Sequence, residues 1–68
     1  MNKELLTAQE YEILKMLADS CPRKNIAEKL NISYSKCNSI VRKIFKKFDA
    51  PNTANCIYKA YYEGFLKF

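Results

Sequence analysis

The polar and basic side chains of residues 33–48 are the part of this sequence best suited to bind another molecule. Ser33 has the residue type of a helix N-cap, and no Gly or Pro interrupts the fifteen residues that follow it. On a helical period, one side of this segment carries short hydrogen-bonding groups and then long basic ones. These residues are Ser35, Lys36, Asn38, Ser39 and Arg42, followed by Lys43, Lys46 and Lys47. Such a side is suited to a nucleic-acid groove flanked by phosphates.

The positive charge of the chain is concentrated around the same segment. The net charge is +5, but residues 23–47 alone carry +7, whereas residues 1–22 sum to −2 and residues 48–68 to zero. A run of charge taken alone usually marks only a solvated surface. Its concentration in the middle third of a small chain favours a polyanionic partner.

Other kinds of chemistry find little support. The chain has no histidine, no Gly-rich phosphate loop and no evident carboxylate pair in a concave setting, which argues against an enzyme. Its three cysteines form no C-x-x-C pair, which argues against a zinc site or a disulfide framework. We therefore expect no metal, no cofactor and no evident small-molecule substrate, and reduced thiols in a cytoplasmic protein. No apolar run approaches the roughly 20 residues of a membrane span.

The remaining residues predict a single all-α domain over residues 1–68. Thr7 and Glu10 have the spacing of a capping box, so a first helix is expected over 8–18. Pro22 suits the first position of a second helix that runs to residue 30. Only three residues separate that helix from the basic segment, and this spacing predicts a helix-turn-helix.

The apolar positions indicate which sides of these helices face inward. In the basic segment they form one continuous arc of Tyr34, Cys37, Ile40, Val41, Ile44, Phe45 and Phe48. A fourth helix, capped by Asn52 and ended by Gly64, is expected to turn Ile57, Ala60 and Tyr61 inward. Tyr58 and Tyr62 fall outside that arc, one turn apart, and indicate a contact surface.

Taken together, the order of these residues resembles the LuxR/FixJ/NarL/GerE family of bacterial DNA-binding domains over residues 5–66. The residues that carry the resemblance are Leu6-Thr7, Glu10, Ile13, Leu14 and Leu17, then Ile26-Ala27, Leu30 and Ile32-Ser33, then Ile44, Lys47 and Phe48, and finally Ala60 and Gly64. They are similar to the family's L-T-x-R-E-x-E-V-L-x-L-L, I-A-x-x-L-x-I-S, I-L-x-K-L and A-x-x-x-G. The chain is a divergent member, because Lys36-Cys37 replaces the family's T-V, Ile40 its common His, and Ser20 and Asp49 its loop glycines.

The resemblance implies a four-helix domain whose third helix reads the DNA major groove and whose fourth supplies a dimer contact. Carried over by position, Asn38, Ser39 and Arg42 would face bases. Phosphate contacts would come from Arg23, Lys24, Lys36, Lys43 and Lys47, and we add Ser35 and Lys46 from the same polar side. Tyr58 and Tyr62 would form the contact of a homodimer.

Two functions therefore follow from the sequence. The favoured one is sequence-specific binding of double-stranded DNA by a bacterial transcription regulator, with Arg42 on guanine and Asn38 on adenine. The alternative is a protein-interaction module of the same fold that binds a regulator or polymerase and not DNA. The basic segment favours the first, and the tyrosine pair leaves the second open.

Overall fold

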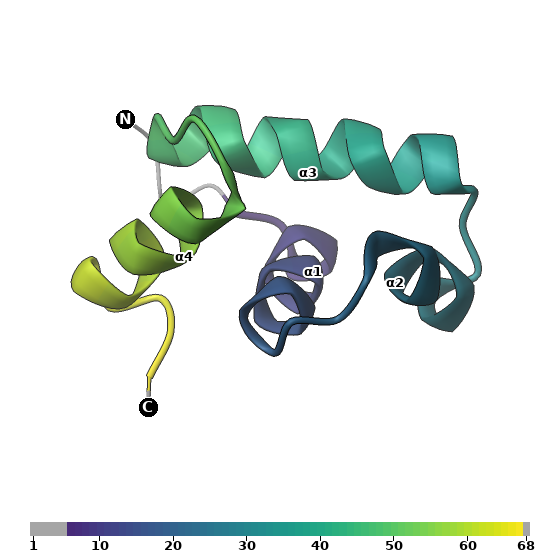
Figure 1. Cartoon of the computed structure of the whole chain (residues 1–68), viewed down its shortest axis with the longest axis horizontal. Helices are drawn as coiled ribbons and strands as arrows, with labels where there is room; N and C mark the ends of the chain where they lie inside the picture. The colour runs from purple at the N-terminus through teal and green to yellow at the C-terminus, as the bar shows by residue number, and fades with distance from the viewer. Residues whose placement is uncertain (1–5, 68) are drawn as a thin grey trace.

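The computed structural model describes residues 6–67, which form four helices and no strand. They are α1 (Ala8–Ala18), α2 (Arg23–Leu30), α3 (Tyr34–Phe48) and α4 (Thr53–Tyr62). Helix α3 runs the length of the molecule, and α1, α2 and α4 all lie beneath it and contact it (Figure 1). The predicted all-α fold, with α2 and α3 joined by a short turn, is confirmed. One long side of α3 is left uncovered by the other helices (Figure 1).

Side-chain caps set where three of the helices begin. The predicted capping box is present, because Glu10 N–H donates to Thr7 Oγ1 at 3.0 Å and Thr7 N–H donates to Glu10 Oε1 at 2.9 Å. Ser33 and Asn52 accept from the N–H groups of Lys36 and Asn55 at 3.0 and 2.9 Å. These bonds satisfy N–H groups that the first helical turn leaves without a partner.

The start of α2 differs by one residue from its prediction. Pro22 is the N-cap and not the first helical residue, since its ψ of 145° is extended. Its carbonyl accepts from Ile26 N–H at 3.0 Å, so it closes the first turn from outside the helix. A cap position suits proline as well, because the ring's missing N–H would find no partner in either place.

Each of the four helices is followed, within two residues of its end, by a residue in the left-handed region. These residues are Ser20, Asn31, Asp49 and Gly64, with φ between 54° and 87°. The next residue then donates its N–H back into the last turn, as Phe65 does to the Ala60 carbonyl at 2.9 Å. The predicted end of α4 at Gly64 is confirmed. After the other three helices the residue with positive φ is not glycine, so its side chain adds a steric cost that glycine would not have.

A single core lies between α3 and the three helices beneath it. Its buried members are Ile13, Leu14, Leu17, Ile26, Ala27, Cys37, Ile40, Val41, Ile44, Phe48, Cys56, Ala60 and Leu66. After Gly64 the chain folds back, and the Phe65 ring packs edge-on against Phe48 with centroids 5.4 Å apart. Leu66 is buried in the core as well, so the chain after α4 covers part of the core.

One residue of the predicted apolar arc faces solvent. Tyr34 is 55% exposed, while Cys37, Ile40, Val41 and Ile44 are buried as expected. Tyr34 is the first residue of α3 and stands at the edge of the arc, so fewer neighbours surround it than surround the later residues. Its inclusion in the inward face was wrong.

Candidate nucleic-acid interface

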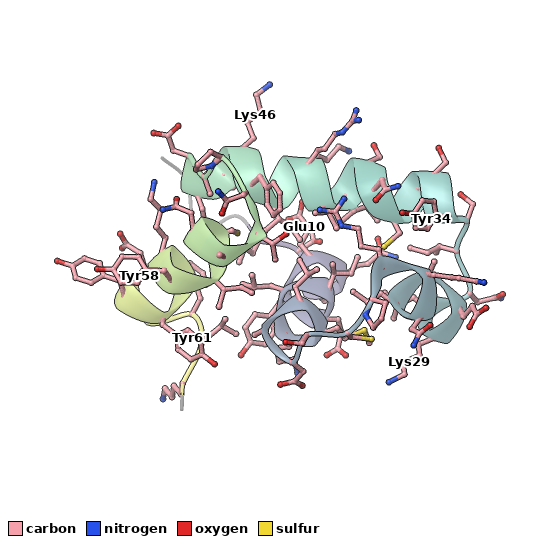
Figure 2. The ribbon with its side chains drawn as sticks, viewed as in Figure 1. Glu10, Lys29, Tyr34, Lys46, Tyr58 and Tyr61 are labelled. Carbon is pink, nitrogen blue, oxygen red and sulfur yellow. The ribbon has the colours of Figure 1, made fainter. Side chains whose placement is uncertain are left out.

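The uncovered side of α3 carries a line of exposed polar residues. Figure 2 shows Lys46 pointing away from α1, α2 and α4. At about 100° of rotation per residue, Ser35, Ser39 and Arg42 share that side of the helix with Lys46, and all four are exposed. We call these four residues the outer stripe. It places two hydroxyl groups in the N-terminal half of α3 and an arginine and a lysine further on.

Basic side chains flank the outer stripe on one edge. Lys36 and Lys43 are exposed there, and Lys47 lies closest to the core and is half-buried. Lys47 Nζ lies 2.6 Å from Glu10 Oε1, so its ammonium forms an ion pair with α1. A phosphate would compete with that carboxylate for Lys47, but it would find Lys36 and Lys43 facing solvent.

The sequence predicted Glu10 only as a member of the capping box at the start of α1, not as the partner of Lys47. Glu10 is 6% exposed and lies beneath α3 (Figure 2). Burial on its own raises the pKa of this carboxyl, but the hydrogen bonds from Lys47 and Thr7 and the charge of Lys43 outweigh burial and lower it. No local signal pairs residue 10 with residue 47, because their contact depends on how α1 packs against α3.

On the opposite edge of the outer stripe, α2 contacts α3 through polar groups. Arg23 Nη1 donates to Asn38 Oδ1 at 3.0 Å, and the Arg23 guanidinium carbon lies 5.8 Å from the centroid of the Phe45 ring. The Cys37 thiol lies 3.7 Å from the Arg23 carbonyl oxygen. Asn38 is consequently half-buried and stands at the border of the exposed surface. Lys24, the next residue of α2, is exposed.

The N-terminus of α3 adds backbone donors at one end of the same surface. Ser33 Oγ accepts a hydrogen bond from the N–H of Lys36, and the Ser33 carbonyl accepts one from the N–H of Cys37 at 3.0 Å. The N–H groups of Tyr34 and Ser35 precede the first intrahelical bond and point out of the helix end. This position suits an anion.

A family comparison identifies the arrangement. The model of the luxR family of bacterial regulatory proteins matches residues 4–60, which run from before α1 into α4. The chain belongs to this family. No curated protein and no solved structure matches it. The resemblance drawn from the order of motifs is thereby confirmed, and α2 and α3 form the helix-turn-helix of a LuxR-type DNA-binding domain.

In this LuxR-type domain, α4 carries an exposed aromatic pair away from the outer stripe. Tyr58 and Tyr62 are 65% and 79% exposed, and their rings stack with centroids 6.3 Å apart and planes 21° apart. Figure 2 shows Tyr58 on the outward side of α4, directed away from the other helices. The predicted outward direction of both tyrosines is confirmed, and their role in a dimer stays a prediction.

The cysteines of the domain are free and two of them belong to the core. Burial raises the pKa of the Cys37 thiol, and it raises that of Cys56 to about 11. Within residues 6–67 no three His, Cys, Asp or Glu side chains gather into a metal site. None of the helices described over this range is long and apolar enough to span a membrane.

Proposed function

We propose that this LuxR-type domain binds double-stranded DNA sequence-specifically as part of a bacterial transcription regulator, with α3 in the major groove. The observation that carries the proposal is the outer stripe. It is the side of α3 that no other helix covers, and it consists of hydrogen-bonding and basic side chains alone. A major groove about 12 Å wide admits one α-helix with its side chains.

The positions of the side chains support a division of roles. Ser39 and Arg42 lie in the middle of the outer stripe and would meet base edges, with Asn38 at its border. Six basic residues around them, together with the Ser35 hydroxyl, would contact phosphates on the two strands that flank the groove. The basic residues are Arg23, Lys24, Lys36, Lys43, Lys46 and Lys47, of which Lys47 also binds Glu10.

Charge supports the same partner. Residues 23–47 carry +7, and they include both the start of α2 and nearly all of α3. Each phosphate that a lysine or arginine neutralises steepens the fall of log affinity with log salt by about 0.9. Several phosphate contacts therefore predict strongly salt-dependent binding to DNA of any sequence, with base contacts adding the preference.

A second candidate function rests on α4. The exposed stack of Tyr58 and Tyr62 has the aromatic character of protein interfaces. It supports a homodimer through α4 on two DNA half-sites, and it equally fits a module that binds a regulator or polymerase and not DNA. A homodimer on two half-sites is compatible with the proposed function, whereas a protein-interaction module that does not bind DNA would replace it.

The proposal is tested in two steps. Duplexes that bind the domain are first selected from a random library at defined salt. Salt titrations then compare the binding of a recovered duplex with that of a scrambled one. We expect a recovered motif, tighter binding to it than to the scrambled duplex, and a steep salt slope on both. A steep slope without a motif would leave only sequence-independent DNA binding. The absence of any salt-dependent DNA binding would favour the protein-interaction module.

A further inference from the structure

The contact between Arg23 and Asn38 constrains how Asn38 can meet a base. The distance of 3.0 Å from Arg23 Nη1 to Asn38 Oδ1 is that of a hydrogen bond between side chains fifteen residues apart. A guanidinium has five N–H donors and no acceptor, and it stays charged at any working pH. The amide oxygen of Asn38 must therefore be the atom that faces Arg23, and the amide NH2 must face away from it.

Arg23 is itself held in place by contacts that do not involve DNA. Its guanidinium lies over the Phe45 ring, which is about two turns further along α3 than Asn38 and on the same edge. Its backbone carbonyl lies within 3.7 Å of the buried Cys37 thiol. Arg23 is half-buried as a result, so its side chain loses little freedom when it binds Asn38.

We propose that Arg23 is a positioning residue that fixes the Asn38 amide as a donor and makes Asn38 select guanine over adenine. This inference rests on the proposed function, because it concerns one base pair of the proposed DNA site. Recognition of adenine by asparagine requires both amide atoms, with Oδ1 accepting from N6 and Nδ2 donating to N7. In this domain Arg23 takes one of the two lone pairs of Oδ1 and turns this oxygen toward its own positive charge. An adenine amino group, itself a donor, would have to share Oδ1 with the charged guanidinium, so this contact is weakened.

Guanine has the complementary edge for a fixed donor. Its O6 and N7 are both acceptors in the major groove, and the NH2 of Asn38 has two hydrogens to offer. The remaining N–H groups of Arg23 are still available to a phosphate, which would hold the guanidinium at the same place. The expectation from sequence that Asn38 pairs with adenine is replaced by a preference for guanine.

Three substitutions separate orientation from simple loss of charge. Arg23→Lys keeps a donor that cannot accept, so the amide orientation is expected to persist. Arg23→Met keeps an apolar stem over Phe45 but has no donor, so the amide can turn and present both atoms to adenine. Asn38→Ala identifies the base pair that Asn38 reads, because the preference at that pair should disappear.

The readout is the ratio of affinities for duplexes that differ only at the Asn38-dependent base pair, measured at one salt concentration. This ratio cancels any general loss of phosphate binding at residue 23. We expect the original protein and Arg23→Lys to favour guanine. Arg23→Met should shift the guanine-to-adenine ratio toward adenine by roughly tenfold, since a bidentate pair discriminates by about this much or more. Thermal melts by circular dichroism establish that each variant is folded.

The results distinguish this inference from the proposed function. A protein that selects no motif at all would overturn both. A clear motif that is identical for the original protein and Arg23→Met, or that is unaffected by Asn38→Ala, would overturn the role of Arg23 and leave the proposed function standing. A preference for adenine in the original protein would overturn the role of Arg23 as well.

Discussion

Lys47 of α3 and Glu10 of α1 form an ion pair whose nitrogen and oxygen lie 2.6 Å apart, at the edge of the core. The same carboxylate oxygen accepts from the N–H of Thr7 at 2.9 Å. A single oxygen atom therefore caps the start of α1 and attaches α1 to the C-terminal half of α3. Because Glu10 is 6% exposed, this pair is screened by solvent far less than an ion pair on the surface.

Replacing the charge of Glu10 should lower stability. Glu10→Gln keeps an oxygen for Thr7 but removes the negative charge that pairs with Lys47, and we expect a loss of about 1–3 kcal/mol in the free energy of unfolding at pH 7. Glu12→Gln is the matched control, since Glu12 is exposed on the same helix and pairs with the exposed Lys15. Urea titrations followed by circular dichroism measure both. Equal effects of the two substitutions would show that the Glu10 pair contributes nothing specific.

The same pair predicts how stability depends on pH. The pKa of Glu10 is lowered in the folded state, so the carboxylate stabilises the fold fully above about pH 4.5, its ordinary value, and loses that contribution as the pH falls through the lowered pKa. Glu10→Gln should therefore show a flatter loss of stability in acid than the original protein. Urea titrations between pH 6 and pH 3 provide the comparison. Curves that stay parallel over this range would contradict the assignment.

Local signals in the sequence predicted most of the fold, because they act over three or four residues. The Thr7 capping box, the Ser33 and Asn52 caps and the inward period of α3 all lie within single helices, and the structure has each of them. Contacts between helices could not be predicted in this way. Arg23 with Asn38 and Glu10 with Lys47 depend on the packing of α2 and α1 against α3, which no local pattern specifies.

The exposure of individual site residues followed the helical period only in part. Ser39 and Arg42 lie on the outer stripe as expected, whereas Asn38 is drawn toward α2 and Tyr34 is turned out to solvent. The period assigns an angle around one helix, but burial at the edge of an arc depends on which neighbour covers it. Positions at such edges are therefore the ones that sequence reasoning misplaces.

Residues with positive φ after the helices are sites where a substitution to glycine should stabilise the fold. Ser20 has a φ of 62°, a conformation that costs a residue with a side chain about 1–2 kcal/mol. Ser20→Gly should therefore raise the free energy of unfolding, by roughly 0.5–1 kcal/mol after glycine's own entropic cost. Ser20→Ala should give no such gain. Asn31→Gly should gain less, since asparagine tolerates this region. Thermal melts rank the three variants, and a gain from Ser20→Ala would contradict the conformational cause.

If the tyrosine pair of α4 forms a dimer contact, replacing it should weaken binding only to DNA that has two half-sites. Tyr58 and Tyr62 contact each other on the surface, so replacing both with Ser should leave the fold intact. If they join two copies of the domain, the variant should bind a duplex with two half-sites more weakly while binding a single half-site as before. Band-shift titrations on the two duplexes measure this. An unchanged affinity for the paired site would exclude the dimer role.

The outer stripe offers a matched pair of residues to separate base reading from phosphate binding. Arg42 and Lys46 are one turn apart on the same side of α3, and both are exposed. Lys46 is a better test of phosphate binding than Lys47, whose loss would also remove the partner of Glu10. Arg42→Ala should cost about 1–3 kcal/mol of binding free energy on the preferred duplex and flatten the preference at one base pair. Lys46→Ala should weaken binding to all sequences alike and reduce the salt slope by roughly one unit.

Salt titrations of both variants on preferred and scrambled duplexes decide between these roles. A base contact is lost only where the base is correct, so Arg42→Ala should act on the preferred duplex and leave the scrambled one nearly unchanged. A phosphate contact is the same on every duplex, so Lys46→Ala should shift both curves together. If Arg42→Ala shifted both curves together as well, Arg42 would bind phosphate, and the base-reading side of α3 would lie closer to Asn38 than to the middle of the outer stripe.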